Sequence, residues 1–117
     1  MLFRSDVRSP AEYAGQDTSG TKRGGHVPAA LNLDWNNNVQ PSPPRTFRPL
    51  AELRPLYDQL GLSPNAEIVV YCSTGIRSSN TLFVLEMLGY PRVRLYPASW
   101  NEWGNRDDLP ITTGAAP

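Results

Sequence analysis

Four consecutive apolar residues, Ile68 to Tyr71, are the feature that most restricts the fold of this chain. Three of the four are β-branched, which is typical of a strand that is covered on both faces. Other short candidate strands lie in residues 2–8, 27–33 and 93–96, and helical patterns lie between them. This alternation predicts an α/β fold with a mainly parallel sheet between two layers of helices.

Two helices of several turns are expected to pack on this sheet. Residues 47–60 carry leucines at spacings of three and four, although Pro55 should kink or split the helix. A second helix should begin at Ser78 or Ser79, because either hydroxyl suits an N-cap, and should end at Leu88.

Length and charge limit the kinds of protein that this chain can be. Its 117 residues suit one compact domain, and its 11 basic and 11 acidic residues cancel, so neither nucleic acid nor a membrane is expected as a partner. Residues 36–44, with three asparagines and three prolines, indicate an exposed loop rather than a linker between domains. No apolar segment approaches the roughly 20 residues that cross a bilayer.

Cys72 is the single cysteine, and it directly follows the central apolar run. A single cysteine excludes an internal disulfide, and a free thiol fits the reducing cytoplasm, which is the expected location. His26, the single histidine, cannot build a zinc site alone, so no metal and no organic cofactor is expected. Ligands of parallel sheets bind beyond the carboxyl ends of the strands, where backbone amides and a helix dipole favour a thiolate. Cys72 is therefore the candidate nucleophile.

The loop after Cys72 predicts a cradle for a negatively charged sulfur atom. Gly75 permits a positive φ angle, and small residues leave the centre of the loop open. Arg77 adds a permanent charge that suits the oxygens of an anionic donor. The candidate catalytic residue is Cys72, and the candidate substrate-binding residues are Ser73, Thr74, Gly75, Ile76 and Arg77.

Several of these residues also have purely structural explanations. A lone cysteine after a strand is often a small buried hydrophobic residue. His26 is expected to bond to the backbone, and Arg8 is expected to pair with Asp6 or another carboxylate. Trp100 and Trp103 are expected to cover the core or the rim of a pocket.

Four segments in the same order resemble the rhodanese domain, and more closely the catalytic carboxyl-terminal half of tandem-domain thiosulfate sulfurtransferases. These segments are residues 6–13, 25–33, 69–79 and 93–104. The resemblance implies a rhodanese-like three-layer α/β/α fold with a central, mainly parallel, five-stranded sheet. It also implies one domain over residues 1–117, with a core at about residues 6–110.

The same resemblance implies a function for the loop. Cys72 would take the sulfane sulfur of thiosulfate as a persulfide and pass it to a thiophilic acceptor such as cyanide or a thiol. The amides of residues 73–77 would form the cradle, and both donor and acceptor would be small molecules. Asp6, Arg8 and His26 would belong to motifs that frame the pocket.

The sequence departs from the family pattern in two places. An alanine, Ala29, stands where a glycine is usual, and this change should mainly affect a local turn. Only five residues precede Asp6, where the family has a helix and tandem members have a whole inactive domain. Either the chain is truncated at the amino end, or its first strand is marginal. Truncation would leave an apolar surface that a missing domain or a second copy of the chain would cover.

Other functions remain open from the sequence. A related fold serves phosphatases and arsenate reductases, but their anion loop is one residue longer than the loop here, which has four residues between Cys72 and Arg77. The smaller ring suits one sulfur atom better than a tetrahedral phosphate. A noncatalytic rhodanese-like module for binding or redox sensing is one alternative, and relay of persulfide sulfur from a cysteine desulfurase is another.

Overall fold

In the computed structural model, which describes residues 2–117, four parallel strands form one sheet in the order β2-β1-β3-β4. The strands are β1 (Leu2–Asp6), β2 (Leu31–Asn32), β3 (Glu67–Tyr71) and β4 (Val93–Leu95). All four lie within the segments predicted as strands or overlap them closely. The apolar run becomes β3, which lies between β1 and β4 inside the sheet.

The family resemblance implied a sheet of five strands. This prediction is wrong for residues 2–117, where the sheet has four strands. Other extended segments in this part of the chain pair only through isolated bridges, one joining His26 to Thr112 and one joining Val39 to Phe47. Three prolines lie between Val39 and Phe47, and proline has no amide to donate to a ladder. Pairing therefore ends after a single bridge.

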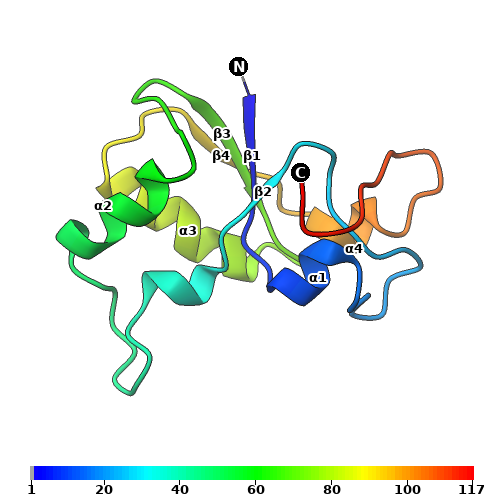
Figure 1. The fold of residues 1–117 in the computed structure, drawn as a ribbon, viewed down its shortest axis with the longest axis horizontal. Coiled ribbons are helices and arrows are strands. Elements are labelled where there is room, and N and C mark those ends of the chain that lie inside the picture. The colour runs from blue at the N-terminus through cyan, green and yellow to red at the C-terminus, as the bar shows by residue number, and fades with distance from the viewer. Residues whose placement is uncertain (1) are drawn as a thin grey trace.

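Helices form a layer on each face of the sheet, as the α/β/α prediction required (Figure 1). One layer holds α2 and α3, and the other holds α1 and α4. The helices are α1 (Pro10–Ala14), the 3-10 helix η1 (Trp35–Asn38), α2 (Leu50–Asp58), α3 (Ile76–Met87) and α4 (Ser99–Trp103). No helix within the described residues is long and apolar enough to cross a membrane.

The alternating side chains of β3 divide the core into two parts. Ile68 and Val70 face α2 and α3, where they pack with buried residues such as Leu53 and Leu85. Tyr71 points to the opposite face and packs in a second cluster, which includes Tyr13, Val27, Ala30 and Trp100. A strand with both faces in use agrees with its continuous apolar sequence.

Two helix predictions need correction. Helix α3 begins at Ile76 with Gly75 as its N-cap, so neither Ser78 nor Ser79 caps it. Gly75 has a φ angle of 94°, which lets the chain turn into the helix earlier than a serine N-cap would. Pro55 lies inside α2 without splitting it. Pro55 is exposed, so water can bond the carbonyl that loses its amide partner.

Candidate active site

Cys72 lies immediately after β3, and its side chain is buried, with 1% of the residue exposed. The start of α4 holds its backbone in place. The Cys72 amide donates to the Ser99 hydroxyl oxygen at 3.0 Å, and the Trp100 amide donates to the Cys72 carbonyl at 2.9 Å. Strand β3 and helix α4 together therefore fix the position of the thiol.

Hydrogen-bond donors surround the sulfur of Cys72. The Gly75 amide donates to Sγ at 3.1 Å, and the Ser78 hydroxyl lies 3.4 Å from it. Burial by itself raises the pKa of the thiol, but hydrogen bonds from Ser78 and from the Thr74 and Gly75 amides outweigh it and lower the pKa below the usual value. A lowered pKa favours the thiolate and supports the nucleophile hypothesis over that of an inert buried residue.

The loop requires a glycine at position 75 for two reasons. Its φ angle of 94° lies in the left-handed region, where a side chain is disfavoured. A Cβ atom at this position would also lie 3.0 Å from the Pro97 carbonyl oxygen. The Ser78 hydroxyl also lies 3.1 Å from the Gly75 carbonyl oxygen, which can accept its single proton when the Cys72 sulfur does not.

Arg77 is held by protein groups on the side of the loop that faces α1. Its two terminal nitrogens donate to the Glu12 carboxylate at 2.8 and 2.9 Å, and one of them also donates to the Ser73 hydroxyl at 2.7 Å. These bonds are the main reason that the pKa of Glu12 falls from 4.5 to about 2, although burial raises it. The Arg77 side chain keeps 29% of its surface exposed.

Glu12 is a site residue that the sequence reasoning missed. It forms a capping box with Ser9 at the start of α1, and it also accepts a bond from the Ser19 hydroxyl at 3.2 Å. The spacing of Ser9, Pro10 and Glu12 is a recognisable helix-start signal. It could have located the carboxylate on α1, but it carries no information about Arg77.

Cys72, Ser73, Thr74 and Gly75 lie in one short loop, and the other two candidate substrate-binding residues, Ile76 and Arg77, lie in the first turn of α3. Within this loop Ser73 contacts Glu12 and Arg77, whereas Thr74 is exposed. Ile76 exposes 77% of its surface at the start of α3. Binding of substrate by Ser73, Thr74, Gly75, Ile76 and Arg77 remains a prediction.

The expected pairing of Arg8 with Asp6 is confirmed. Their side chains are fully buried and joined at 2.7 Å. Arg8 also donates to the Gly25 carbonyl at 2.6 Å and lies over the ring of Trp100, 4.6 Å from its centre. The Tyr71 hydroxyl completes the cluster by donating to Asp6 at 2.8 Å. The hydrogen bonds to the Cys72 sulfur from residues 2–117 come from Gly75 and Ser78, and none comes from this network.

His26 has the structural place that was expected. Its Nδ1 lies 2.7 Å from the Tyr13 carbonyl oxygen, its ring stacks on Tyr13, and its backbone pairs with Thr112. Trp100 is buried in the core, and Trp103 lines a pocket on the sheet face. No group of three or more His, Cys, Asp or Glu side chains in residues 2–117 could hold a metal ion.

Comparison with protein families and curated relatives gives consistent matches. A sequence model of the rhodanese-like domain matches residues 5–106. A sulfur carrier protein, TtuD, of Thermus thermophilus is 46% identical, and the alignment covers 93% of this chain and 40% of the relative. A thiosulfate sulfurtransferase of Corynebacterium glutamicum is also 46% identical, with 93% and 38% covered. The chain thus spans about two fifths of the length of these relatives.

Solved structures give the same picture of the fold. A persulfide form of EanB, in a tetrahedral intermediate state with ergothioneine, superposes with a TM-score of 0.86 at 29% identity. That match covers 96% of this chain and 28% of the EanB chain. An anaerobic ergothioneine biosynthesis enzyme from Chlorobium limicola, with trimethyl histidine, gives a TM-score of 0.84 at 28% identity, with 97% and 28% covered.

Proposed function

This chain belongs to the rhodanese-like domain family, and from that premise we propose that it is a sulfurtransferase. Thiosulfate would be the sulfur donor, and Cys72 would carry the transferred sulfur as a persulfide. One observation carries the proposal. The buried Cys72 sulfur, at the carboxyl end of β3, receives a backbone amide from Gly75 at 3.1 Å and lies 3.4 Å from the Ser78 hydroxyl. Such a site stabilises negative charge on sulfur.

In the first half of the proposed reaction, the Cys72 thiolate attacks the outer sulfur of thiosulfate. A sulfur–sulfur bond forms on Cys72 while the one in the donor breaks, and sulfite leaves with the electron pair. The negative charge then lies on the terminal sulfur, to which the amides of Thr74 and Gly75, now directed at Cys72, would donate hydrogen bonds. The sulfonate oxygens would lie toward Arg77, which retains exposed surface.

In the second half, a nucleophile removes the terminal sulfur. With cyanide, a carbon–sulfur bond forms, thiocyanate leaves, and the electron pair of the broken bond restores the Cys72 thiolate. With a thiol acceptor, the product is a new persulfide. Neither half requires a metal or an organic cofactor, because every bond change occurs at sulfur.

A relay function is the second candidate, since one relative with 46% identity is named a sulfur carrier protein. In that case Cys72 would receive its sulfur from a protein persulfide and pass it to another protein. Ile76, four residues after Cys72, is exposed and offers an apolar surface for such a partner. Donor choice distinguishes the candidates, because a relay domain would load from a cysteine desulfurase much faster than from thiosulfate.

Intact-mass spectrometry before and after addition of thiosulfate tests the proposal. We expect a gain of about 32 Da, the mass of one sulfur in a persulfide, and its loss after cyanide is added. The Cys72→Ser variant should keep the fold and gain no mass. A folded chain that gains no sulfur from thiosulfate or from a desulfurase would instead indicate a noncatalytic binding module.

A further inference from the structure

The carboxylate of Glu12 is fixed beside the Cys72 loop by more than its ion pair with Arg77. It accepts the Ser9 amide at 3.3 Å and the Ser9 hydroxyl at 3.0 Å, and the Ser73 hydroxyl lies 3.4 Å from it. Glu12 is also buried. A buried carboxylate with several donors around it stays in place, so the ion pair is the resting arrangement of the loop.

The positive charge of Arg77 is therefore already matched. Hydrogen bonds to Glu12 are the main reason that the pKa of Arg77 is raised, and the negative charges of Glu12, Cys72 and Asp34 add to this effect, although burial lowers the pKa. Both terminal nitrogens of the guanidinium donate to the Glu12 carboxylate, at 2.8 and 2.9 Å. An anionic donor that binds Arg77 must compete with Glu12 for these nitrogens.

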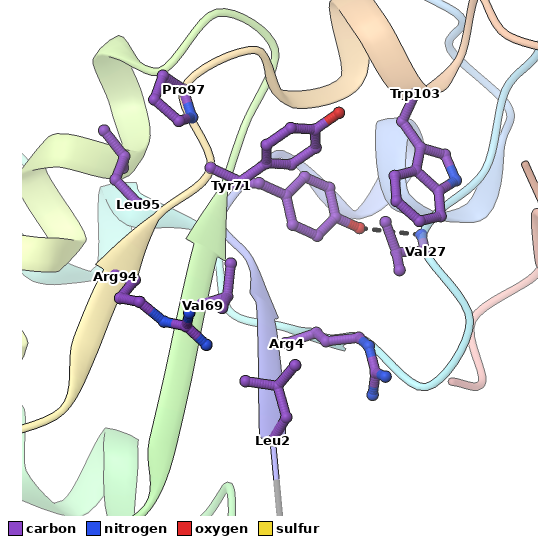
Figure 2. A pocket seen from close by; sticks show the side chains of 10 residues that line it. Leu2, Arg4, Val27, Val69, Tyr71, Arg94, Leu95, Pro97 and Trp103 are labelled. Atoms are coloured by element: carbon purple, nitrogen blue, oxygen red, sulfur yellow. Dashed lines mark hydrogen bonds between the residues drawn. The ribbon is translucent and has the colours of Figure 1, made fainter.

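Two other arginines are set back from the loop. Arg4 of β1 and Arg94 of β4 lie in register with Val69 of β3, three residues before Cys72. Figure 2 shows both arginine side chains nearer to the amino end of β3 than Tyr71, which is the last residue of that strand. These two cations therefore belong to the sheet face and not to the loop that holds the sulfur.

We propose that Glu12 is a positioning residue that sets the charge selectivity of Cys72 by keeping Arg77 in an ion pair. With the pair intact, a dianionic donor such as thiosulfate gains little attraction from Arg77. A donor with a single negative charge, such as a thiosulfonate or an alkyl persulfide, loses less. The inference rests on the proposed sulfurtransferase function where it concerns sulfur donors, but not where it concerns the charge around the thiol.

Two sulfur donors that differ by one charge test the selectivity for donors. Methanethiosulfonate has a methyl group in place of one oxygen of thiosulfate, and so carries one negative charge fewer. In both cases the Cys72 thiolate attacks the outer sulfur, the sulfur–sulfur bond of the donor breaks, and sulfite or methanesulfinate leaves with the electron pair. In intact-mass spectrometry, Glu12→Gln should load from thiosulfate about ten-fold faster than the original chain, and from methanethiosulfonate only about three-fold faster.

Two alkylating agents test the charge around the thiol without sulfur transfer. The Cys72 thiolate displaces iodide from iodoacetate, which is an anion, and from iodoacetamide, which is neutral. A change in the pKa of the thiol cancels from the ratio of the two rates, because both reagents react with the same thiolate. Glu12→Gln should raise the ratio of iodoacetate to iodoacetamide rates about ten-fold.

Variants of Arg77 show whether Glu12 acts through this residue. Arg77→Gln leaves the Glu12 carboxylate without its cation and should lower the same ratio. The double variant Glu12→Gln, Arg77→Gln removes both charges, so its ratio should return to nearly that of the original chain. An unchanged ratio in either single variant would overturn the proposal.

The chain offers a matched control for the loss of a carboxylate. Glutamine at position 12 suits the capping box with Ser9 as glutamate does, so Glu12→Gln should keep α1 folded. Glu67→Gln removes a carboxylate that pairs with Arg92 and Arg94, each at 3.4 Å, and should leave the alkylation ratio unchanged. An equal rise of the ratio in Glu67→Gln would overturn the proposal. If the ratio changes as expected but neither donor loads sulfur, the proposed function is wrong and the role of Glu12 in charge selectivity stands.

Discussion

Both terminal nitrogens of Arg77 donate to the carboxylate of Glu12, at 2.8 and 2.9 Å, and so connect α3 to α1 across the candidate site. Ser73 lies between them, because its hydroxyl accepts from Arg77 at 2.7 Å. The loop that carries Cys72 is thus closed by a residue 65 positions earlier in the chain. Loop geometry and the stability of α1 should therefore depend on each other.

This connection predicts coupling between Glu12 and Arg77 in a double-mutant cycle. Because the pair is bidentate and mostly buried, Glu12→Ala and Arg77→Ala should each destabilise the fold, with a coupling energy of about 1–2 kcal/mol. Urea unfolding of both single variants and the double variant measures it. The more exposed pair of Glu67 and Arg92 is the control and should couple by less than about 1 kcal/mol. Additive effects at Glu12 and Arg77 would contradict the prediction.

The lowered pKa of Glu12 predicts a loss of stability in acid. The pKa of Glu12 is about 2 in the folded chain and 4.5 in the unfolded chain, so the folded chain binds this proton only at a lower pH. The pair therefore stabilises the fold fully above pH 4.5, and this contribution disappears as the pH falls toward 2. Free energies of unfolding between pH 6 and about pH 2, compared for the original chain and Glu12→Gln, isolate it. Parallel curves for the two chains would show that Glu12 contributes nothing to this pH dependence.

Ser78 should control the acidity of the thiol. In Ser78→Ala the hydroxyl 3.4 Å from Cys72 Sγ is lost, so the pKa of Cys72 should rise and alkylation by iodoacetamide at neutral pH should slow several-fold. The rate of alkylation as a function of pH gives the pKa directly. Ser79→Ala is the matched control, because the Ser79 hydroxyl donates to the Ile76 carbonyl and does not approach the sulfur. Equal alkylation rates for the two variants would show that Ser78 does not lower the pKa of Cys72.

Gly75→Ala should lower the free energy of unfolding by more than the unfavourable φ angle alone would cost. The left-handed φ costs about 1–2 kcal/mol for alanine, and the contact with the Pro97 carbonyl at 3.0 Å adds to it. Gly89→Ala is an informative control, since Gly89 has a similar φ of 92° and open space around it. Urea unfolding should show a larger loss for Gly75→Ala, and sulfur loading of Cys72 should fall with it. Equal losses would mean that the Pro97 contact is tolerated.

The sheet and the place of Cys72 were predictable from local sequence. The run Ile68 to Tyr71 has a composition that fits few structures other than a central strand, and the residue after such a strand lies at the ligand edge by topology. The fifth strand was expected only from family resemblance, and no local pattern supported it. The sequence therefore predicted the central strand correctly, because burial on both faces determines which residue types the strand contains.

Contacts between distant segments were not predictable in the same way. Glu12 has a local role as the capping-box partner of Ser9 at the start of α1. Nothing near Glu12 in the sequence indicates that it also pairs with Arg77. Asn38 belongs to a polar stretch that indicated an exposed loop, but it is buried and accepts from the Tyr57 hydroxyl at 2.6 Å. Both residues are polar groups whose partners only the folded chain supplies.

Ala29 offers a test of strain at a position where the family usually has glycine. Its φ angle is 68°, in a turn that the Ala30 amide closes onto the Val27 carbonyl at 3.0 Å. Glycine would remove a left-handed penalty of about 1–2 kcal/mol, but it loses more entropy on folding, by about 0.5–1 kcal/mol. Ala29→Gly should therefore stabilise the chain by about 0.5–1 kcal/mol, and its melting temperature should rise by a few degrees. Ala30→Gly, which removes a fully buried methyl group next to it, should do the opposite. A lower melting temperature for Ala29→Gly would show that the turn accommodates the methyl group without strain.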